Sequence, residues 1–394
     1  MKRIVPLAAC AAFCVHAHAQ SSVTLYGIID EGINYNSNLQ GGRAFGLESA
    51  VMQGSRWGFR GSEDLGGGLK AIFTLENGFD NNTGKAGQGG LLFGRQAFVG
   101  LSHDRWGTLT FGRQYDVNAD FVGPLEAASQ WSGNIGAHLG DMDNLNDAYR
   151  TDNALKYRSP EFGGFSFGAM YSFGGVPGSV GRDQEWSVAA RYASGPLTVA
   201  AGYNNVRNPN LAVFGNSLNA AQAAQTDNAS AYPSFNGFLS ANTWQVASVG
   251  ANYTIGASTF GVVYSNIAFL SLGNTANGPN PSGYAGSVHF NIVEANYRYR
   301  FTPALSAGVA YVYTNRSRIS SASGDNSGAT YHQAMASVDY AFSARTDVYL
   351  LGIFQQASGT DSLDLPAVAS ITNQPGPSSS DRQAVIRIGM RHRF

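Results

Sequence analysis

The sequence predicts an all-β protein, a transmembrane antiparallel β-barrel of about 16 strands. Three observations lead to this prediction. The chain begins with an export signal, it has no apolar run long enough for a membrane helix, and much of it consists of short segments in which apolar and polar residues alternate. Hydrocarbon accepts only helices and closed barrels, because every backbone polar group there needs a hydrogen-bond partner.

The first 19 residues have the pattern of a cleavable export signal. Lys2 and Arg3 form a basic start, Ile4–Val15 is an apolar run of small residues, and Ala17-His18-Ala19 is a cleavage pattern of the A-x-A type. We therefore expect a signal peptide at 1–19 and a single barrel domain at 20–394.

Both cysteines, Cys10 and Cys14, lie inside the expected signal. A competing lipoprotein cleavage site at Leu7–Cys10 would leave an apolar core of only about six residues, shorter than a signal needs. Without cysteines, the mature chain has no disulfide framework, thiolate metal site or cysteine nucleophile.

Composition excludes several other classes of protein. The chain is 43% hydrophobic and 13% charged, with 49 Gly, 19 Tyr and 23 Phe, and its net charge is −1. Abundant aromatic residues argue against disorder. The chain lacks the excess of positive charge that would indicate a nucleic-acid partner. Removal of Lys2 and Arg3 with the signal makes it more acidic still.

The C-terminal segment shows the alternation most clearly. One face carries Ile386, Ile388 and Met390, and the opposite face carries Arg387 and Arg391. Segments 293–301 and 305–313 alternate in the same way. Such a pattern suits a wall with lipid outside and water inside. A soluble β-sandwich, such as an exported lectin, would bury the apolar face instead, so aromatic strand ends favour the membrane barrel.

Connections between the segments alternate in length. Seven short turns are expected at Glu63–Gly68, His103–Trp106, Ser159–Gly164, Ser194–Pro196, Ile255–Ala257, Phe301–Ala304 and Ser343–Thr346. Eight long, Gly/Asn/Ser-rich loops are expected near 36–50, 80–91, 116–148, 174–183, 206–242, 267–286, 315–329 and 357–381. Together they connect about 16 strands, with short turns at one end and long loops at the other.

Several ordered motifs resemble the general trimeric porins of Gram-negative bacteria, of the betaproteobacterial type. They are Ser22–Gly27 (SVTLYG), Ser55–Gly61 (SRWGFRG), Gly94–Leu101 (GRQAFVGL), Gly107–Tyr115 (GTLTFGRQY), Arg150–Tyr157 (RTDNALKY) with Ser159-Pro160, and the terminal Phe394. The resemblance implies an outer-membrane diffusion channel for small hydrophilic solutes and ions that is not an enzyme. It also implies a homotrimer in contact with lipid and lipopolysaccharide, and recognition of Phe394 by the barrel assembly machinery.

The resemblance further implies a constriction in which the third outer loop, expected at Tyr115–Tyr149, folds into the barrel. Its carboxylates would face basic residues of the wall. By motif match the expected wall residues are Arg56, Arg60, Arg95, Arg150, Lys156 and Arg158. Among the loop acids Asp116, Asp120, Glu126, Asp141 and Asp143, the favoured ones are Asp120 and Glu126. Ile28 stands where the family often has a basic residue, and Arg113 is expected to point away from the pore.

Charged strand residues predict the ion preference. Arg191, Arg298, Arg300, Arg387 and Arg391 are expected to face inward, against the acids Asp30, Glu76, Glu294 and Asp339. An excess of inward positive charge predicts a preference for anions despite the acidic net charge.

No cofactor or metal site is expected. The five histidines beyond the signal, His103, His138, His289, His332 and His392, show no metal-ligand spacing. Neither a nucleophile elbow nor a spacing that selects a catalytic Ser–His pair is present, which argues against a barrel enzyme. A substrate-specific channel remains a third alternative, although such channels commonly have more strands.

Overall fold

The computed structural model describes residues 21–214, 232–273, 278, 280–322 and 324–394. The expected signal peptide, 1–19, lies outside the described residues and stays a prediction. Among the described helices, none is long and apolar enough to cross a membrane.

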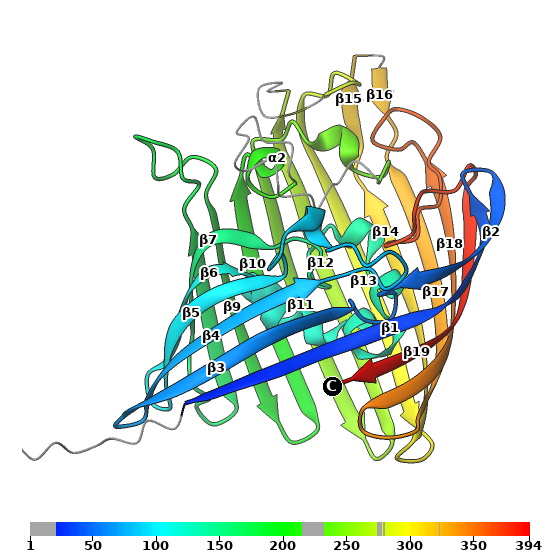
Figure 1. The fold of residues 1–394 in the computed structure, drawn as a ribbon. Helices are drawn as coiled ribbons and strands as arrows, with labels where there is room; N and C mark the ends of the chain where they lie inside the picture. Colours follow the sequence, from blue (N-terminus) through cyan, green and yellow to red (C-terminus); the bar gives the residue numbers. More distant parts are fainter. Residues whose placement is uncertain (1–20, 215–231, 274–277, 279, 323) are drawn as a thin grey trace, which may run out of the picture.

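The described strands form a closed antiparallel barrel (Figure 1). They are β1 (Ser22–Leu39), β2 (Gly42–Ser49), β3 (Arg56–Gly66), β4 (Leu69–Gly78), β5 (Gln96–His103), β6 (Gly107–Gln114), β7 (Thr151–Arg158), β8 (Phe165–Ser172), β9 (Glu185–Ser194), β10 (Leu197–Arg207), β11 (Thr243–Ile255), β12 (Ser258–Leu272), β13 (Gly286–Arg300), β14 (Leu305–Arg316), β17 (Ala329–Ala341), β18 (Thr346–Gly359) and β19 (Arg382–Arg393). The hairpin β15 (Ile319–Ser321) and β16 (Gly324–Asn326) stands apart from the wall.

β2 and β3 share one position in the wall. The first half of β1 pairs with β3 and its second half pairs with β2. Counted this way, the described chain forms 16 strand positions, as predicted. The expected first loop near 36–50 is wrong: β1 continues to Leu39, and a tight turn leads into β2. Asn36, at the start of the expected loop, looks like a loop residue in sequence, but it is buried inside the barrel.

The two ends of the chain close the barrel. β1 and β19 run antiparallel from Ile28↔Arg393 to Asn36↔Val385. The backbone amides of Gly27 and Phe394 each donate to the carbonyl oxygen of the other, at 3.0 Å. Figure 1 shows the C-terminus at the end of the barrel that carries the tight turns, opposite the long loops. The seven predicted short turns are confirmed in the described residues.

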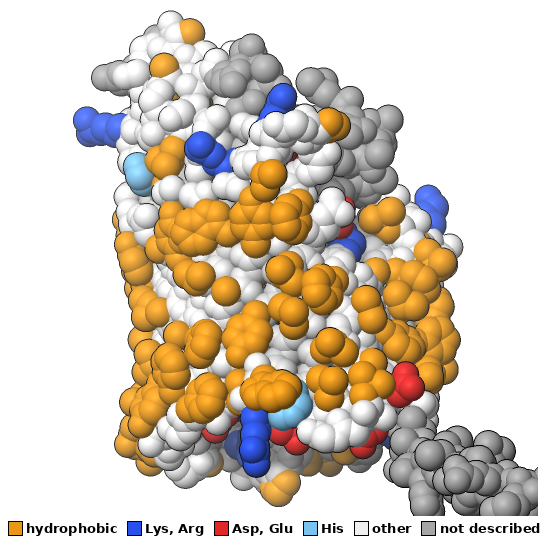
Figure 2. Space-filling model, turned by 90° about the vertical axis from the view of Figure 1, so that its left-hand side faces the viewer, with side chains coloured by type: hydrophobic (Ala, Val, Ile, Leu, Met, Phe, Trp, Pro, Cys, Tyr) orange, Lys and Arg blue, Asp and Glu red, His pale blue; other side chains and the backbone are white. Residues whose placement is uncertain are grey.

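The predicted orientation of the strand faces is also confirmed. Ile388, Val309 and Val293 point outward, with 65%, 53% and 49% of their surface exposed, whereas Arg387 is fully buried inside. Apolar side chains cover much of the outer surface in Figure 2. An apolar belt outside and polar groups inside are what a barrel wall in a lipid bilayer requires.

The third loop folds into the barrel, as expected. It contains α1 (Val117–Phe121) and short helical turns at Gly123–Leu125, Ala128–Ser132, Asn134–Gly136 and Leu139–Asp141. Gly308 on β14 makes room for it, since a Cβ there would lie 2.4 Å from the Trp131 ring. Gly133, with φ of 68°, turns the loop where a side chain would meet the Met52 backbone.

An apolar cluster inside the barrel was not predicted. Phe235 and Phe238, between β10 and β11, pack against Phe269 of β12 and Phe290 of β13, joined by Trp131 of the third loop. The helix α2 (Pro209–Ala212) and the turn Asn236–Phe238 belong to this region. Part of the barrel interior is therefore a packed apolar core, because loops that fold inward need apolar contacts to stay there.

Candidate functional site

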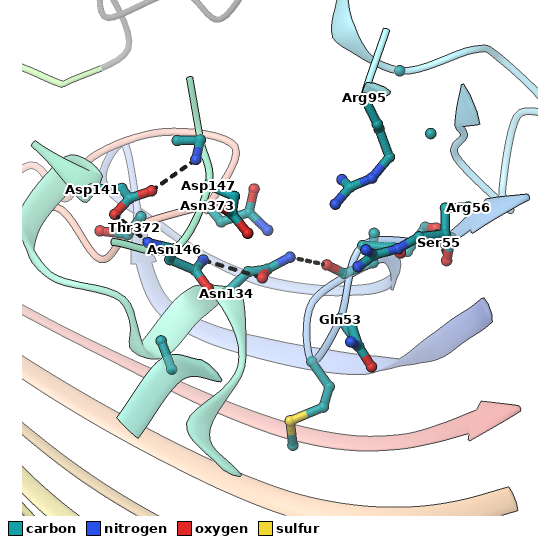
Figure 3. A pocket seen from close by; sticks show the side chains of 18 of the residues that line it. Gln53, Ser55, Arg56, Arg95, Asn134, Asp141, Asn146, Asp147, Thr372 and Asn373 are labelled. Carbon is teal, nitrogen blue, oxygen red and sulfur yellow. Dashed lines mark hydrogen bonds between the residues drawn. The ribbon is translucent and has the colours of Figure 1, made fainter. Parts of the chain in front are cut away.

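A cavity of about 640 Å³ lies inside the barrel between the wall and the third loop. We call it the central cavity and define it by Arg56, Arg95, Arg150, Asp141 and Asp147, which all line it. Figure 3 shows Arg56 and Arg95 on one side and Asp141 and Asp147 on the other. Basic groups of the wall thus face acidic groups of the loop across an open space.

Glu76 of β4 positions two of the arginines. Nε of Arg95 donates to Glu76 Oε1 at 2.8 Å, and NH1 of Arg56 lies 3.9 Å from the same oxygen. The hydroxyl of Tyr26 donates to the other carboxylate oxygen at 2.9 Å. One buried carboxylate therefore holds two guanidinium groups at the cavity wall, which leaves an excess of positive charge.

Tyr115 lies between Arg95 and Arg150. NH2 of Arg95 donates to the Tyr115 hydroxyl at 2.8 Å, and the Arg150 guanidinium carbon lies 5.4 Å from the centroid of the Tyr115 ring. The Arg150 NH1 group also donates to the Ala148 carbonyl at 2.6 Å. The start and the end of the third loop thereby hold these arginines in place.

Arg391 and Arg393 of β19 extend the basic lining of the cavity. Each pairs with Asp347 of β18 at 3.0 Å, and Arg391 also donates to Gln53 at 3.2 Å. Sequence reasoning placed Arg391 inward but did not assign either arginine to the site. The strand alternation was a sufficient signal, because both residues share the inward face of Arg387.

Asp141 and Asp147 supply the acidic side of the cavity. Asp141 accepts hydrogen bonds from the backbone amides of Asn146 at 3.0 Å and Ala148 at 2.9 Å, so it organises the loop end. Burial and the nearby Asp120 raise the pKa of Asp147 to about 7, against the opposing effect of Arg150. Asp147 was missed in the sequence because nothing in its neighbourhood distinguishes it from a solvated loop aspartate.

Lys156 and Asp120 form a separate pair. Nζ of Lys156 lies 2.7 Å from Asp120 Oδ2 and donates to the Tyr115 carbonyl at 2.8 Å. The pair fastens α1 to β7, and neither residue is among those that line the central cavity. It therefore anchors the beginning of the third loop.

Arg60 and Arg158 also lie away from the central cavity. Arg60 is exposed and covers the Tyr26 ring at 5.1 Å, and Arg158 is exposed and covers the Phe121 ring at 5.2 Å. Arg158 is the last residue of β7, next to a short turn, and Arg60 lies in the middle of β3.

The expected position of Glu126 needs correction. Its side chain is completely buried and does not line the cavity. Glu126 Oε1 accepts from the backbone amide of His138 at 3.1 Å, and both residues pack against Glu294 of β13. The carboxylate points toward the wall behind the third loop, because the helical turns of the loop reverse the chain at this point.

Comparisons with known proteins agree with this architecture. A family profile described as Gram-negative porin matches residues 7–352. An outer membrane porin protein of Bordetella pertussis is 39% identical over 53% of this chain, and outer membrane porin protein 32 of Delftia acidovorans is 37% identical over 51%. The chain spans 60% and 58% of the length of these two relatives.

Among solved structures, the anion-selective porin from Comamonas acidovorans has a similar fold. Its TM-score is 0.70 at 21% identity, and the match covers 95% of this chain and 100% of that one. The apolar belt and the named relatives place this chain in the outer membrane. With the family profile covering most of its length, the chain belongs to the Gram-negative porin family.

Proposed function

We propose that this protein is a general diffusion channel that passes small hydrophilic solutes and ions through the outer membrane and prefers anions. The observation that supports it most directly is the lining of the central cavity. Among the described residues that line it, five are arginines and three are aspartates: Arg56, Arg95, Arg150, Arg391, Arg393, Asp80, Asp141 and Asp147. No catalytic step or cofactor is part of this proposal.

The charge on the acidic side is smaller than the count of aspartates implies. Asp147 has a pKa of about 7, and burial beside Asp143 raises the pKa of Asp141 well above its usual value. Near neutral pH the arginines therefore outweigh the ionised carboxylates. A low-dielectric wall strengthens their potential, so anions concentrate in the cavity and cations are disfavoured.

We further propose that Arg56, Arg95 and Arg150 are the constriction residues, with Asp147 opposite them. Arg60 and Arg158 extend the basic surface beyond the constriction and steer anions to or from it, whereas Lys156 pairs with Asp120 and holds the third loop in place. A transverse field between opposed charges orders water and penalises apolar solutes, which accounts for passage of hydrophilic ones.

Planar-bilayer recording tests the channel and its selectivity. In a salt gradient, the reversal potential should have the sign of anion preference. Neutralising Arg56, Arg95 and Arg150 one at a time should reduce that preference in each case. Cation preference in the wild type would refute the proposal, and unchanged selectivity in all three variants would refute the assigned constriction.

We also propose a homotrimer. Arg113 on the outer side of β6 pairs with Asp152 of β7 at 2.6 Å, so charged side chains lie on the outer face of the wall here. Charges facing lipid are costly, so this part of the wall suits contact with a neighbouring subunit. Unheated electrophoresis and crosslinking of the detergent-purified protein should show three chains, and a monomer under both conditions would contradict the trimer.

Phe394 is our proposed signal for the barrel assembly machinery. Its backbone hydrogen bonds with Gly27 complete the closure of the barrel, and its ring covers Gly27 so closely that a Cβ there would lie 2.3 Å away. Deleting Phe394 should lower the amount of folded barrel in outer membranes, whereas wild-type levels would contradict the assignment.

A further inference from the structure

Behind the third loop, three side chains from distant parts of the sequence meet in a completely buried cluster. Glu126 and His138 belong to the loop, and Glu294 belongs to β13. One ligand atom from each lies within 4.8 Å of the other two. The cluster is separate from the central cavity, since none of the three residues lines it.

Hydrogen bonds fix one polar atom of each side chain. Glu294 Oε1 accepts from the Ala127 amide at 2.8 Å and from Asn296 Nδ2 at 2.7 Å, and Glu126 Oε1 accepts from the His138 amide at 3.1 Å. Among the described residues, Oε2 of both glutamates and Nε2 of His138 are buried without a hydrogen-bond partner. Such orphaned polar atoms are costly, so their convergence points to an occupant.

Asp143 orients the histidine as a metal ligand. Its Oδ2 lies 2.7 Å from Nδ1 of His138 and is itself buried. A carboxylate on one ring nitrogen fixes the proton there and makes the other nitrogen the ligand, an arrangement that metal-binding histidines commonly have.

We propose that Glu126, His138 and Glu294 bind a Zn²⁺ ion that ties the third loop to the barrel wall. Nε2 of His138 lies 3.5 Å from Glu294 Oε2 and 3.9 Å from Glu126 Oε1. A tetrahedral Zn²⁺ with bonds of about 2.0–2.1 Å holds its ligand atoms roughly 3.3–3.4 Å apart. One imidazole and two carboxylates suit zinc better than Ca²⁺ or Mg²⁺, which prefer all-oxygen sites with more ligands.

The ion would cross-link the loop that shapes the central cavity. Glu126 and His138 flank the segment that packs Trp131 against β14, and Glu294 is fixed in the wall. Binding would neutralise the two buried carboxylates, and so favour the folded position of the loop. This role is additional to the proposed channel function and does not depend on it.

Metal content tests the site directly. The protein is purified from outer membranes in detergent, unfolded, refolded with Zn²⁺ so that burial cannot block entry, freed of excess ion, and analysed for zinc per chain. One equivalent is expected. His138→Gln and Glu294→Gln should each retain less than about a tenth of it.

Glu185→Gln is the matched control. Glu185 is a buried glutamate on β9 that hydrogen-bonds to Thr151 and Asn204 and lies outside the cluster. Its variant should retain the full equivalent. Zinc no higher than the buffer blank in the wild type, or equal zinc in the wild type and the cluster variants, would overturn the proposal.

A cobalt spectrum of the wild type covers the case in which the variants fail to fold. Co²⁺ refolded into the protein should give the intense visible absorption of a tetrahedral ion with few ligands. Only the weak bands of octahedral Co²⁺, or loss of the bound ion to excess Ca²⁺, would overturn the assignment. Asp143→Asn should keep the ion but weaken binding by about 10- to 100-fold.

Discussion

Asp147 offers a test of the electrostatic account of the channel, because its charge changes within an accessible pH range. Its pKa of about 7 means that the carboxyl group is neutral below that pH and negative above it. By titration, it is about 97% ionised near pH 8.5 and about 3% ionised near pH 5.5. Lowering the pH therefore removes one negative charge from the central cavity, and anion preference should rise.

The size of the effect follows from Coulomb's law. An ion about 5 Å from the carboxylate in a water-like medium changes in energy by roughly 0.8 kcal/mol. Screening with a Debye length of about 10 Å in 0.1 M salt reduces this to roughly 0.5 kcal/mol. Cations and anions shift in opposite directions, so the ratio of their permeabilities should change by roughly 1 kcal/mol, or about five-fold.

Reversal potentials in planar bilayers at both pH values measure this ratio. Asp147→Asn should show the high anion preference at both pH values, with little difference in the permeability ratio between them. Asp64→Asn is a suitable control, because Asp64 is exposed near the turn after β3 and does not line the cavity. The reasoning is refuted if anion preference falls as the pH falls, or if Asp147→Asn keeps the wild-type pH dependence.

Three further predictions concern the wall. Arg95→Gln removes one positive charge from the cavity and should lower the anion-to-cation permeability ratio by roughly five-fold in the same recording. This change is as large as that expected on protonation of Asp147, but opposite in sign. Gly308→Val would collide with Trp131, so thermal unfolding should show a loss of roughly 1–3 kcal/mol; Gly352→Val, where a Cβ meets nothing within 4 Å, should show little change. Val309→Lys puts a charge on the lipid face and should cost about 2–4 kcal/mol in urea titrations of vesicle-inserted protein, and an unchanged midpoint would argue against membrane exposure there.

Much of the barrel follows from local patterns. Alternation along β13, β14 and β19 identified the inward and outward residues correctly, because period two in a strand leaves no other arrangement once one face is known. The short turns were equally clear from Gly, Pro and Ser. The β1–β2 hairpin was missed because its polar inward side chains, such as Asn36, resemble a loop when the partner strand is unknown.

The site was only partly predictable. Motif matches indicated Arg56, Arg95 and Arg150, and the structure brings all three to one cavity. Periodicity gave no basis for choosing among the loop acids, because an irregular backbone has no period that assigns its side chains to a face. Glu126 therefore was expected in the pore but is buried, and Asp147 was not singled out although it lines the cavity.

By itself, the sequence determined the barrel class and the basic character of its interior, since these depend on strand periodicity. The pairing of β1 with β19 that closes the barrel joins the two ends of the chain and was seen only in the tertiary structure. Only the tertiary structure decided what the third loop presents to the channel and what it presents to the wall. The meeting of Glu126 and His138 with Glu294 is the clearest case. No spacing along the chain encodes it, because it arises from a loop that folds back onto a strand more than 150 residues away.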